Sequence, residues 1–164
     1  MTNPDIQNDE PNPASPAVLV AIDMFPVGME RLRAVYPVHK AVTHPARMEY
    51  ARSHAEQVRA ILTNGTTPIT AELIDALPRL SIICAQGVGF EGVDLEAARA
   101  CGIMVTHGPG TNAECVADHA MALMLGVIRD VHNADHLVRA GGWREGNTMR
   151  PAASGKRVGI LGLG

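Results

Sequence analysis

Two short glycine-containing stretches follow apolar runs of the chain and have the composition of an anion-binding site. Gln86-Gly-Val-Gly89 comes after the run 80–84, and Asn64-Gly65 comes after the run 60–63. Ligands of an open α/β sheet bind outside the carboxyl ends of its strands, and glycine leaves backbone N–H groups free to face an anion. The residues that could form such a site are Asn64, Gly65, Gly87, Val88 and Gly89. Ordinary strand-to-helix turns are the alternative interpretation of both stretches.

A third stretch, Val158-Gly-Ile-Leu-Gly-Leu-Gly164, has the pattern of a buried strand that runs into two glycines. Gly162 and Gly164 match the first two glycines of GxGxxG, in which the first makes a tight turn and the second admits a pyrophosphate. Two glycines at this spacing are a weak signal alone, and taken alone they favour a plain strand end; the apolar strand and the Gly-Lys-Arg segment before them support the motif.

Other residue types that could carry chemistry form no pattern for it. Cys84, Cys101 and Cys115 have no CxxC spacing and are expected to be reduced thiols. His132 and His136 are four residues apart, but no third ligand stands near them, so no metal site is predicted. His107 ends an apolar run, on the edge where ligands are expected, and has no assigned role.

The elements that must position the anion site alternate along residues 17–108. Short apolar runs at 17–22, 38–42, 60–63, 80–84 and 103–106 are typical of strands buried on both faces of a parallel sheet. Helix signals lie between them, including a helix over 71–77 after Thr70 and another over 95–100 with Asp94 as its N-cap. This alternation predicts an open, doubly wound α/β domain of about five strands. Residues 1–16, which contain four prolines, are expected to be a disordered lead-in.

Residues 109–164 have a different pattern. Thr111-Asn-Ala-Glu114 reads as a capping box, with Thr111 as the N-cap, and apolar residues recur behind it at helical spacing. A second helix is expected over roughly 133–140, ending at Gly141-Gly142.

Composition narrows the classes of protein to consider. The chain is 46% hydrophobic with a net charge of −3, and its basic residues are scattered, which argues against a nucleic-acid partner. It has neither a signal-peptide pattern nor an apolar run of membrane-spanning length. A cytoplasmic protein with no membrane partner is the expectation.

Seven blocks between Ile61 and Gly164 together resemble the D-isomer-specific 2-hydroxyacid dehydrogenase family. They are Leu62-Thr-Asn-Gly65, Leu73-Ile-Asp-Ala-Leu-Pro78, Gly87-Val-Gly-Phe-Glu-Gly-Val-Asp94, Ala97-Ala-Arg-Ala-Cys-Gly-Ile103, Val116-Ala-Asp-His-Ala-Met-Ala-Leu123, Val138-Arg-Ala-Gly-Gly-Trp143 and Gly155 to Gly164. The Val-Ala-Asp and Arg-x-Gly-x-Trp forms are most similar to the hydroxypyruvate and glyoxylate reductase branch, which implies a preference for NADPH over NADH.

The resemblance implies a flavodoxin-like substrate domain over 17–108. Over 109–164 it implies interdomain and dimerisation helices, and then the first strand of a Rossmann domain. Backbone amides of Val88 and Gly89 would hold the substrate carboxylate, and Asn64-Gly65 would line the same cleft. Gly162 and Gly164 would approach the cofactor, NADP or NAD, and Cys115 would lie near the nicotinamide. A homodimer is implied as well.

The same resemblance places the catalytic Arg, Glu and His beyond Gly164, so the 164 residues alone are expected to be inactive. In its complete form the protein would reduce a small 2-keto acid such as hydroxypyruvate or glyoxylate. A dinucleotide-binding regulatory relative, similar to a corepressor, or a non-catalytic binding fragment is the alternative. A phosphorylation receiver is rejected, because Asn64 ends the third run where a receiver needs Asp. Glu91, His107 and Cys115 depart from the residues usual in the family.

Overall fold

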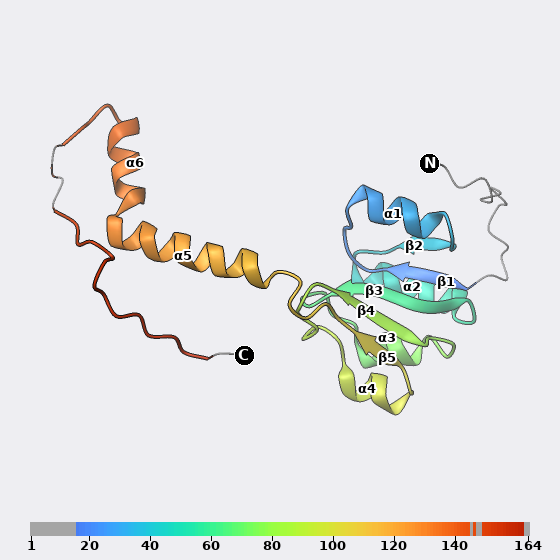
Figure 1. Cartoon of the computed structure of the whole chain (residues 1–164). Helices are drawn as coiled ribbons and strands as arrows, with labels where there is room; N and C mark the ends of the chain where they lie inside the picture. Colours follow the sequence, from blue (N-terminus) through green and yellow to red (C-terminus); the bar gives the residue numbers. More distant parts are fainter. Residues whose placement is uncertain (1–15, 145, 147–148, 163–164) are drawn as a thin grey trace, which may run out of the picture. The chain divides into compact units, whose positions relative to one another are not determined.

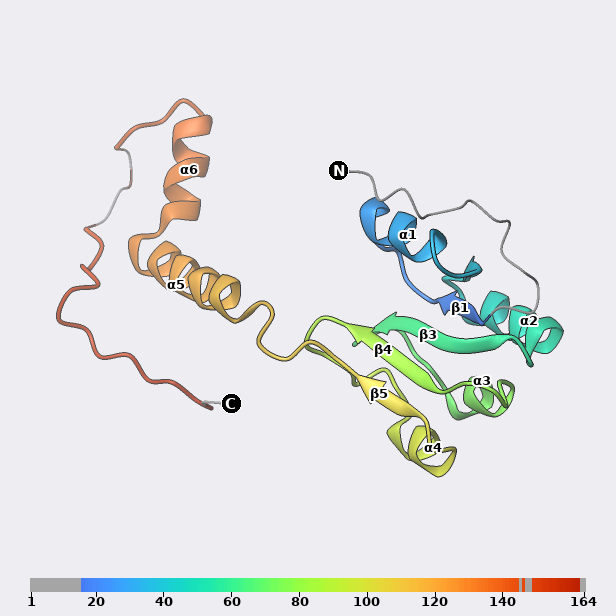
Figure 2. The same ribbon diagram turned by 45° about the vertical axis from the view of Figure 1, so that its right-hand side comes forward.

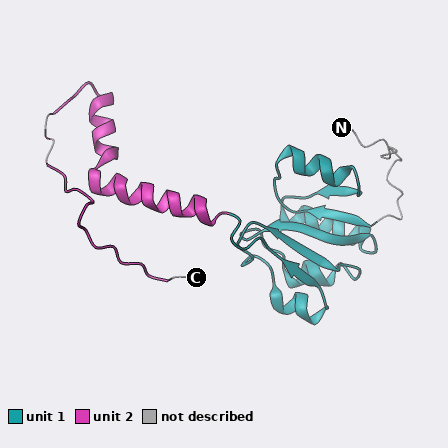
Figure 3. Ribbon diagram, viewed as in Figure 1, with its two compact units in different colours: residues 1–111 teal, residues 112–164 magenta. Residues whose placement is uncertain are grey.

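The computed structural model describes residues 16–144, 146 and 149–162. The chain forms two compact units, Met1–Thr111 and Asn112–Gly164 (Figure 3). Among the residues described, no helix is both long and apolar enough to cross a membrane.

The first unit is built on a parallel sheet of five strands, whose order is β2-β1-β3-β4-β5 (Figures 1 and 2). The strands are β1 (Ala17–Val20), β2 (Val38–Lys40), β3 (Val58–Asn64), β4 (Ile82–Gln86) and β5 (Met104–Thr106). In this order β2 lies on one side of β1, and the later strands follow one another on the other side. The order is that of a flavodoxin-like sheet. The predicted doubly wound α/β fold is therefore confirmed.

Helices cover both faces of this sheet, as a sheet buried on two sides requires. The helix α1 (Pro26–Arg33) packs on one face, where Met29 joins Val18 and Val20 in a small core. The helices α2 (His44–His54), α3 (Ala71–Asp75) and α4 (Leu95–Ala100) supply the larger core on the other face. Leu19, Ile61 and Ile83, which point into that core from three neighbouring strands, are fully buried.

The N-termini of three of these helices are capped by side chains that follow the carboxyl end of a strand. The hydroxyl of Thr43 accepts from Ala46 N, and that of Thr70 accepts from Leu73 N. Asp94 accepts from Ala97 N at 3.0 Å. Because these caps fix where each helix begins, they also fix the length of the loop between strand and helix. Asp94 is the cap that the sequence predicts, and Thr70 directly precedes its helix, as expected.

The second unit contains α5 (Ala113–Arg129) and α6 (Val131–Arg139), joined at Asp130 in a left-handed conformation. Its start corrects one expectation. Asn112, not Thr111, precedes the helix, because the Thr111 hydroxyl donates to Gly108 O at 2.8 Å instead of capping α5. The second helix also begins at Val131, two residues earlier than expected.

The expected strand at the end of the chain differs from the structure. Residues 156–160 have no regular secondary structure, and Val158 and Ile160 are exposed. A strand needs a neighbour to accept its backbone hydrogen bonds, and this stretch pairs with no other described segment. Residues 163–164, and all but the last residue of the predicted lead-in 1–16, lie outside the described residues.

Candidate functional site

The two predicted glycine loops lie against each other at the carboxyl edge of the sheet. Asn64 and Gln86 end the adjacent strands β3 and β4 and are paired in register. Beyond them, Gly65 and Gly89 approach so closely that a Cβ on Gly65 would lie 2.8 Å from both the Cα and the carbonyl carbon of Gly89. The structure therefore brings together all five residues that the sequence singled out, and only glycine fits at position 65.

Backbone hydrogen bonds lock these loops in place. Gly92 N donates to Gly65 O at 2.7 Å, and Ile69 N donates to Gly92 O at 2.8 Å, so the loop after β4 is tied to the loop after β3. Within the latter, the side-chain oxygen of Asn64 accepts from Thr67 N at 2.8 Å and from Thr66 N at 3.1 Å. The side-chain carbonyl of Asn64 thus stabilises the conformation of the loop that follows β3.

A buried arginine side chain also holds the loop after β3 through hydrogen bonds. Arg47, on α2, is 2% exposed and donates to Val42 O at 2.6 Å and to Pro68 O at 3.3 Å. Burial lowers the pKa of this guanidinium from its usual range. Because its hydrogen-bond acceptors among the described residues are carbonyl oxygens, Arg47 joins the chain after β2 to the chain after β3 rather than neutralising an acid.

The turn Gly87-Val88-Gly89 presents two backbone donors. Gly87 has a φ of 93°, a conformation that favours glycine, and its carbonyl accepts from Gly108 N at 2.7 Å. Neither Val88 N–H nor Gly89 N–H donates to another residue in the described part of the chain. Two adjacent unengaged amides on a fixed turn can bind an anion such as a carboxylate.

His107 lies beside this turn and was not assigned a role from the sequence. Its Nδ1 is 2.8 Å from Val88 O, and its ring meets the ring of Phe90 edge-on, with centroids 4.8 Å apart. The position of His107 directly after the predicted fifth strand was the available signal, but a contact with Val88, nineteen residues away, could not be inferred from spacing.

One acidic group modifies the electrostatics of the turn. The Oε2 atom of Glu91 lies 2.7 Å from the position that a Cβ on Gly89 would occupy. Glu91 is exposed, so solvent screens its charge. A bound anion would nevertheless have this carboxylate as a neighbour.

The residues expected to meet a dinucleotide are only partly described. Gly162 has a φ of 87°, which suits the tight turn expected of a first motif glycine, whereas Gly164 lies outside the described residues. Cys115 is exposed in the first turn of α5.

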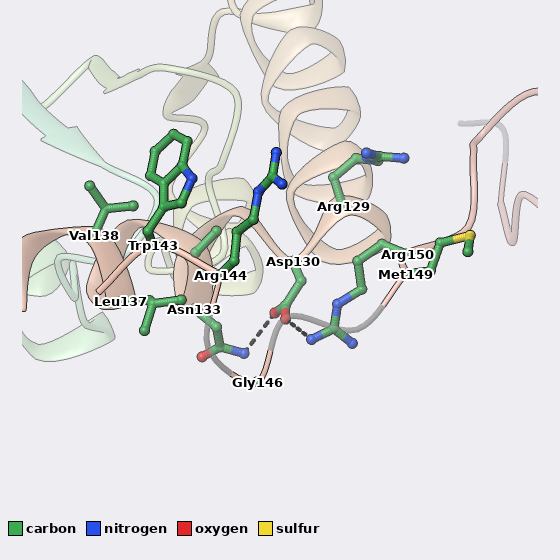
Figure 4. A pocket seen from close by; sticks show the side chains of 11 residues that line it. Arg129, Asp130, Asn133, Leu137, Val138, Trp143, Arg144, Gly146, Met149 and Arg150 are labelled. Atoms are coloured by element: carbon green, nitrogen blue, oxygen red, sulfur yellow. Dashed lines mark hydrogen bonds and ion pairs between the residues drawn. The ribbon is translucent and has the colours of Figure 1, made fainter. Parts of the chain in front are cut away.

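A separate hollow of about 970 Å³ lies in the second unit, between α6 and the segment that follows it (Figure 4). Among the residues that line it, Asp130 accepts a hydrogen bond from Asn133 and forms a salt bridge with Arg150. Its wall includes Trp143, which is 68% exposed, and Met149, which is fully exposed. The hollow is therefore an open surface feature with charged, polar and apolar side chains in its lining, and it did not figure among the predicted sites.

Comparison with known proteins decides the family. The model of the family described as "D-isomer specific 2-hydroxyacid dehydrogenase, catalytic domain" matches residues 18–156, which is most of the chain. The chain belongs to the D-isomer-specific 2-hydroxyacid dehydrogenase family. The resemblance stated from sequence motifs is thereby confirmed, and the two glycine loops lie within the matched residues.

Similar members of this family are reductases of 2-keto acids. The chain is 42% identical over 123 residues to a hydroxyphenylpyruvate reductase of Plectranthus scutellarioides, an alignment that covers 74% of this chain and 39% of the relative. It is 36% identical over 157 residues to a glyoxylate reductase of Aeropyrum pernix, covering 91% of this chain and 47% of the relative. The chain thus spans about half the length of these dehydrogenases or less.

Solved structures of the family have the same fold. A dehydrogenase from Rhizobium meliloti superposes with a TM-score of 0.76 at 39% identity, over 89% of this chain and 51% of that one. An NADPH-dependent glyoxylate/hydroxypyruvate reductase from Sinorhizobium meliloti, in complex with NADP and malonate, gives a TM-score of 0.72 at 33% identity. That alignment covers 91% of this chain and 46% of the reductase.

Proposed function

We propose that the chain is the substrate-binding part of an NAD(P)-dependent reductase of small 2-keto acids, and that Val88 and Gly89 hold the substrate carboxylate through their backbone amides. The observation that carries this proposal is the pair of unengaged N–H groups on a turn that its neighbours hold rigidly. Fixed amides that need no reorganisation bind a negative charge more strongly than mobile ones.

The names of similar proteins support a small substrate. Gly65 closes the turn on one side by direct backbone contact with Gly89, and Asn64 belongs to the same loop. The similar proteins named for glyoxylate or hydroxypyruvate act on acids of two or three carbons, and we propose this class for the complete protein. Glyoxylate and hydroxypyruvate are the substrates to assay first.

The proposed cofactor is NADPH, with NADH as the second choice. A structural relative at 33% identity is described as NADPH-dependent and carries NADP. When bound, the dinucleotide would supply the hydride, while the amides of Val88 and Gly89 would orient the carboxylate of the acceptor. Gly162, Gly164 and Cys115 are the residues of this chain proposed to lie near the cofactor.

We further propose that the protein is a homodimer held by its two C-terminal helices. None of the residues of α5 and α6 is buried, although Val116, Met121, Leu123 and Val127 are apolar and more than half exposed. Apolar helix surface of this extent is typical of a protein–protein interface.

Steady-state kinetics of a Gly89→Val variant tests the carboxylate assignment. The experiment uses the complete protein, including any residues that follow Gly164, with glyoxylate and hydroxypyruvate. A Cβ at Gly89 would lie 3.3 Å from Gly65 Cα and would meet Glu91, so Val crowds the turn without forcing a strained φ. We expect KM for the 2-keto acid to rise at least about tenfold, the loss of roughly one charge-assisted hydrogen bond, with KM for NADPH unchanged. An unchanged KM for the acid would remove Val88 and Gly89 from the site.

A further inference from the structure

A single hydrogen bond fixes which nitrogen of His107 carries a proton. Nδ1 of His107 is 2.8 Å from Val88 O, and a carbonyl oxygen can only accept. Nδ1 therefore donates, and the neutral ring is the Nδ1–H tautomer. Phe90 meets the imidazole edge-on and limits rotation of its plane. The hydrogen bond to Val88 O and the contact with Phe90 together hold the His107 side chain in one orientation.

The acceptor of this bond, Val88 O, lies in the same peptide plane as Gly89 N–H, one of the two amides proposed to bind the substrate carboxylate. The chain has no cis peptide bond among its described residues, so the C=O of residue 88 and the N–H of residue 89 point in opposite directions. A donor that holds Val88 O on the His107 side consequently turns Gly89 N–H toward the opposite side. The orientation of that amide is then determined by the side chain at position 107.

The neighbouring peptide, between Gly87 and Val88, is held in the same way by the segment 107–108. Gly108 N donates to Gly87 O at 2.7 Å, which turns Val88 N–H away from the chain at 107–108. The two adjacent amides are thus both oriented by the residues that directly follow β5. One of these two contacts is made by the backbone N–H of residue 108 and is available to any residue type except proline, whereas the other depends on the His107 side chain.

We infer that His107 is a positioning residue for substrate binding: its Nδ1–H holds the Val88–Gly89 peptide so that Gly89 N–H faces the substrate carboxylate. This inference rests on the proposed function of the turn. It assigns His107 no part in proton transfer, since its bonded nitrogen is engaged with a backbone carbonyl. The requirement at position 107 is a hydrogen-bond donor attached at Cγ, rather than an imidazole.

That requirement defines a matched pair of variants. His107→Phe retains an aromatic ring against Phe90 but has no donor. His107→Asn places an amide nitrogen on Cγ, as the imidazole has Nδ1, and restores the donor without a titratable ring. His54 is the last residue of α2 and stacks on Tyr50. The His54→Phe variant therefore provides a histidine-to-phenylalanine control away from the turn.

The test measures the kinetics of the complete protein and the binding of oxalate, a stable dicarboxylate, by each variant. Loss of one hydrogen bond predicts that His107→Phe raises both KM for the 2-keto acid and the Kd of oxalate about three- to tenfold, with kcat and the KM of NADPH unchanged. His107→Asn is expected to return both to within about twofold of the wild type. His54→Phe is expected to leave them unaltered.

Nitrogen NMR of the imidazole provides a readout that does not depend on activity. The wild-type spectrum should show the Nδ1–H tautomer for His107, and His107→Phe should shift the Gly89 amide resonance more than those of β3. Wild-type affinity for oxalate in His107→Phe, or failure of His107→Asn to restore it in a folded protein, would overturn the inference. If the wild type binds oxalate but reduces no 2-keto acid, the proposed reaction fails while the role of His107 at the turn stands.

Discussion

The contact between Gly65 and Gly89 sets the geometry of the site at the scale of single residues. The nearest obstacle to a side chain on Gly65 is the backbone of Gly89, at 2.8 Å, whereas a Cβ on Gly89 would lie 3.3 Å from Gly65 Cα. Backbone atoms cannot move aside as the end of a flexible side chain can. The loops after β3 and β4 can therefore keep their present separation only with glycine at position 65.

Replacement of Gly65 by alanine should destabilise the first unit. The new methyl group would force the two loops apart, and overpacking of this kind costs about 1–3 kcal/mol. Chemical denaturation monitored by far-UV circular dichroism measures the effect. Gly28→Ala is the matched control, because its Cβ meets only the terminal methyl of Met24, at 2.9 Å, and alanine favours the helix. Equal stability of the two variants would contradict the close approach.

Sequence reasoning predicted the residues of the turn but not how they are held. The five site residues followed from glycines at the ends of apolar runs, a local pattern. The Gly65–Gly89 contact and the bond between His107 and Val88 join residues 24 and 19 positions apart. They depend on strand order and register, which no local spacing specifies.

A stack of three rings joins β2 to α2 at the scale of elements. His39 lies parallel to Tyr50 with centroids 3.7 Å apart, and Tyr50 stacks on His54 at 4.2 Å. Partial burial lowers the pKa of His39 from its ordinary value of 6.5, and the nearby His54 lowers it further. Burial raises the pKa of Tyr50.

Stability of the first unit should consequently fall as the pH drops below about 6.5. The pKa of His39 is lower in the folded state than in the unfolded chain, so the unfolded chain binds more protons in this range. The contribution of His39 is complete above its unfolded pKa and is lost progressively on acidification. Thermal unfolding of the wild type and of His39→Phe between pH 8 and 5 tests this. A wild-type slope no steeper than that of the variant would contradict it.

The elements themselves were predicted unevenly, for reasons visible in the chain. All five strands were anticipated: four are compact apolar runs, whereas β2 contains His39 and Lys40 and is a weak one. The helices α1 and α2 were not placed, although Pro26 begins one and Thr43 caps the other, because their apolar periodicity is weak. The start of α5 was misplaced because Thr111 has a competing acceptor in Gly108 O, a contact that depends on the local turn.

At the scale of the whole molecule, the exposed apolar surface of α5 and α6 predicts self-association. Sedimentation equilibrium should show a dimer for the wild type. Leu123 and Val127 lie one turn apart and are 57% and 80% exposed, so replacing both with lysine should give a monomer without loss of the first unit's fold. His132→Lys, an exposed polar position on α6, serves as the control. A monomeric wild type at high concentration would contradict the interface.

The 164 residues by themselves should show no reductase activity. They contain the proposed carboxylate cradle, but the resemblance assigns none of them to the catalytic Arg, Glu or His. Loss of a positioned proton donor alone commonly lowers rates by about 10²- to 10⁴-fold. NADPH and NADH oxidation with glyoxylate or hydroxypyruvate, on protein of verified mass, is the assay. Turnover clearly above a no-protein control would show that this assignment of catalytic residues is wrong.

The central claim is that Val88 and Gly89 bind a carboxylate, and an amide NMR titration of the 164-residue chain with oxalate tests it most directly. We expect saturable shifts that are largest at the Val88 and Gly89 N–H resonances, because these donors have no partner among the described residues. The shifts should be lost in Gly89→Val while resonances of the sheet persist. Saturable shifts centred elsewhere, or none at Val88 and Gly89 in the folded chain, would contradict the claim.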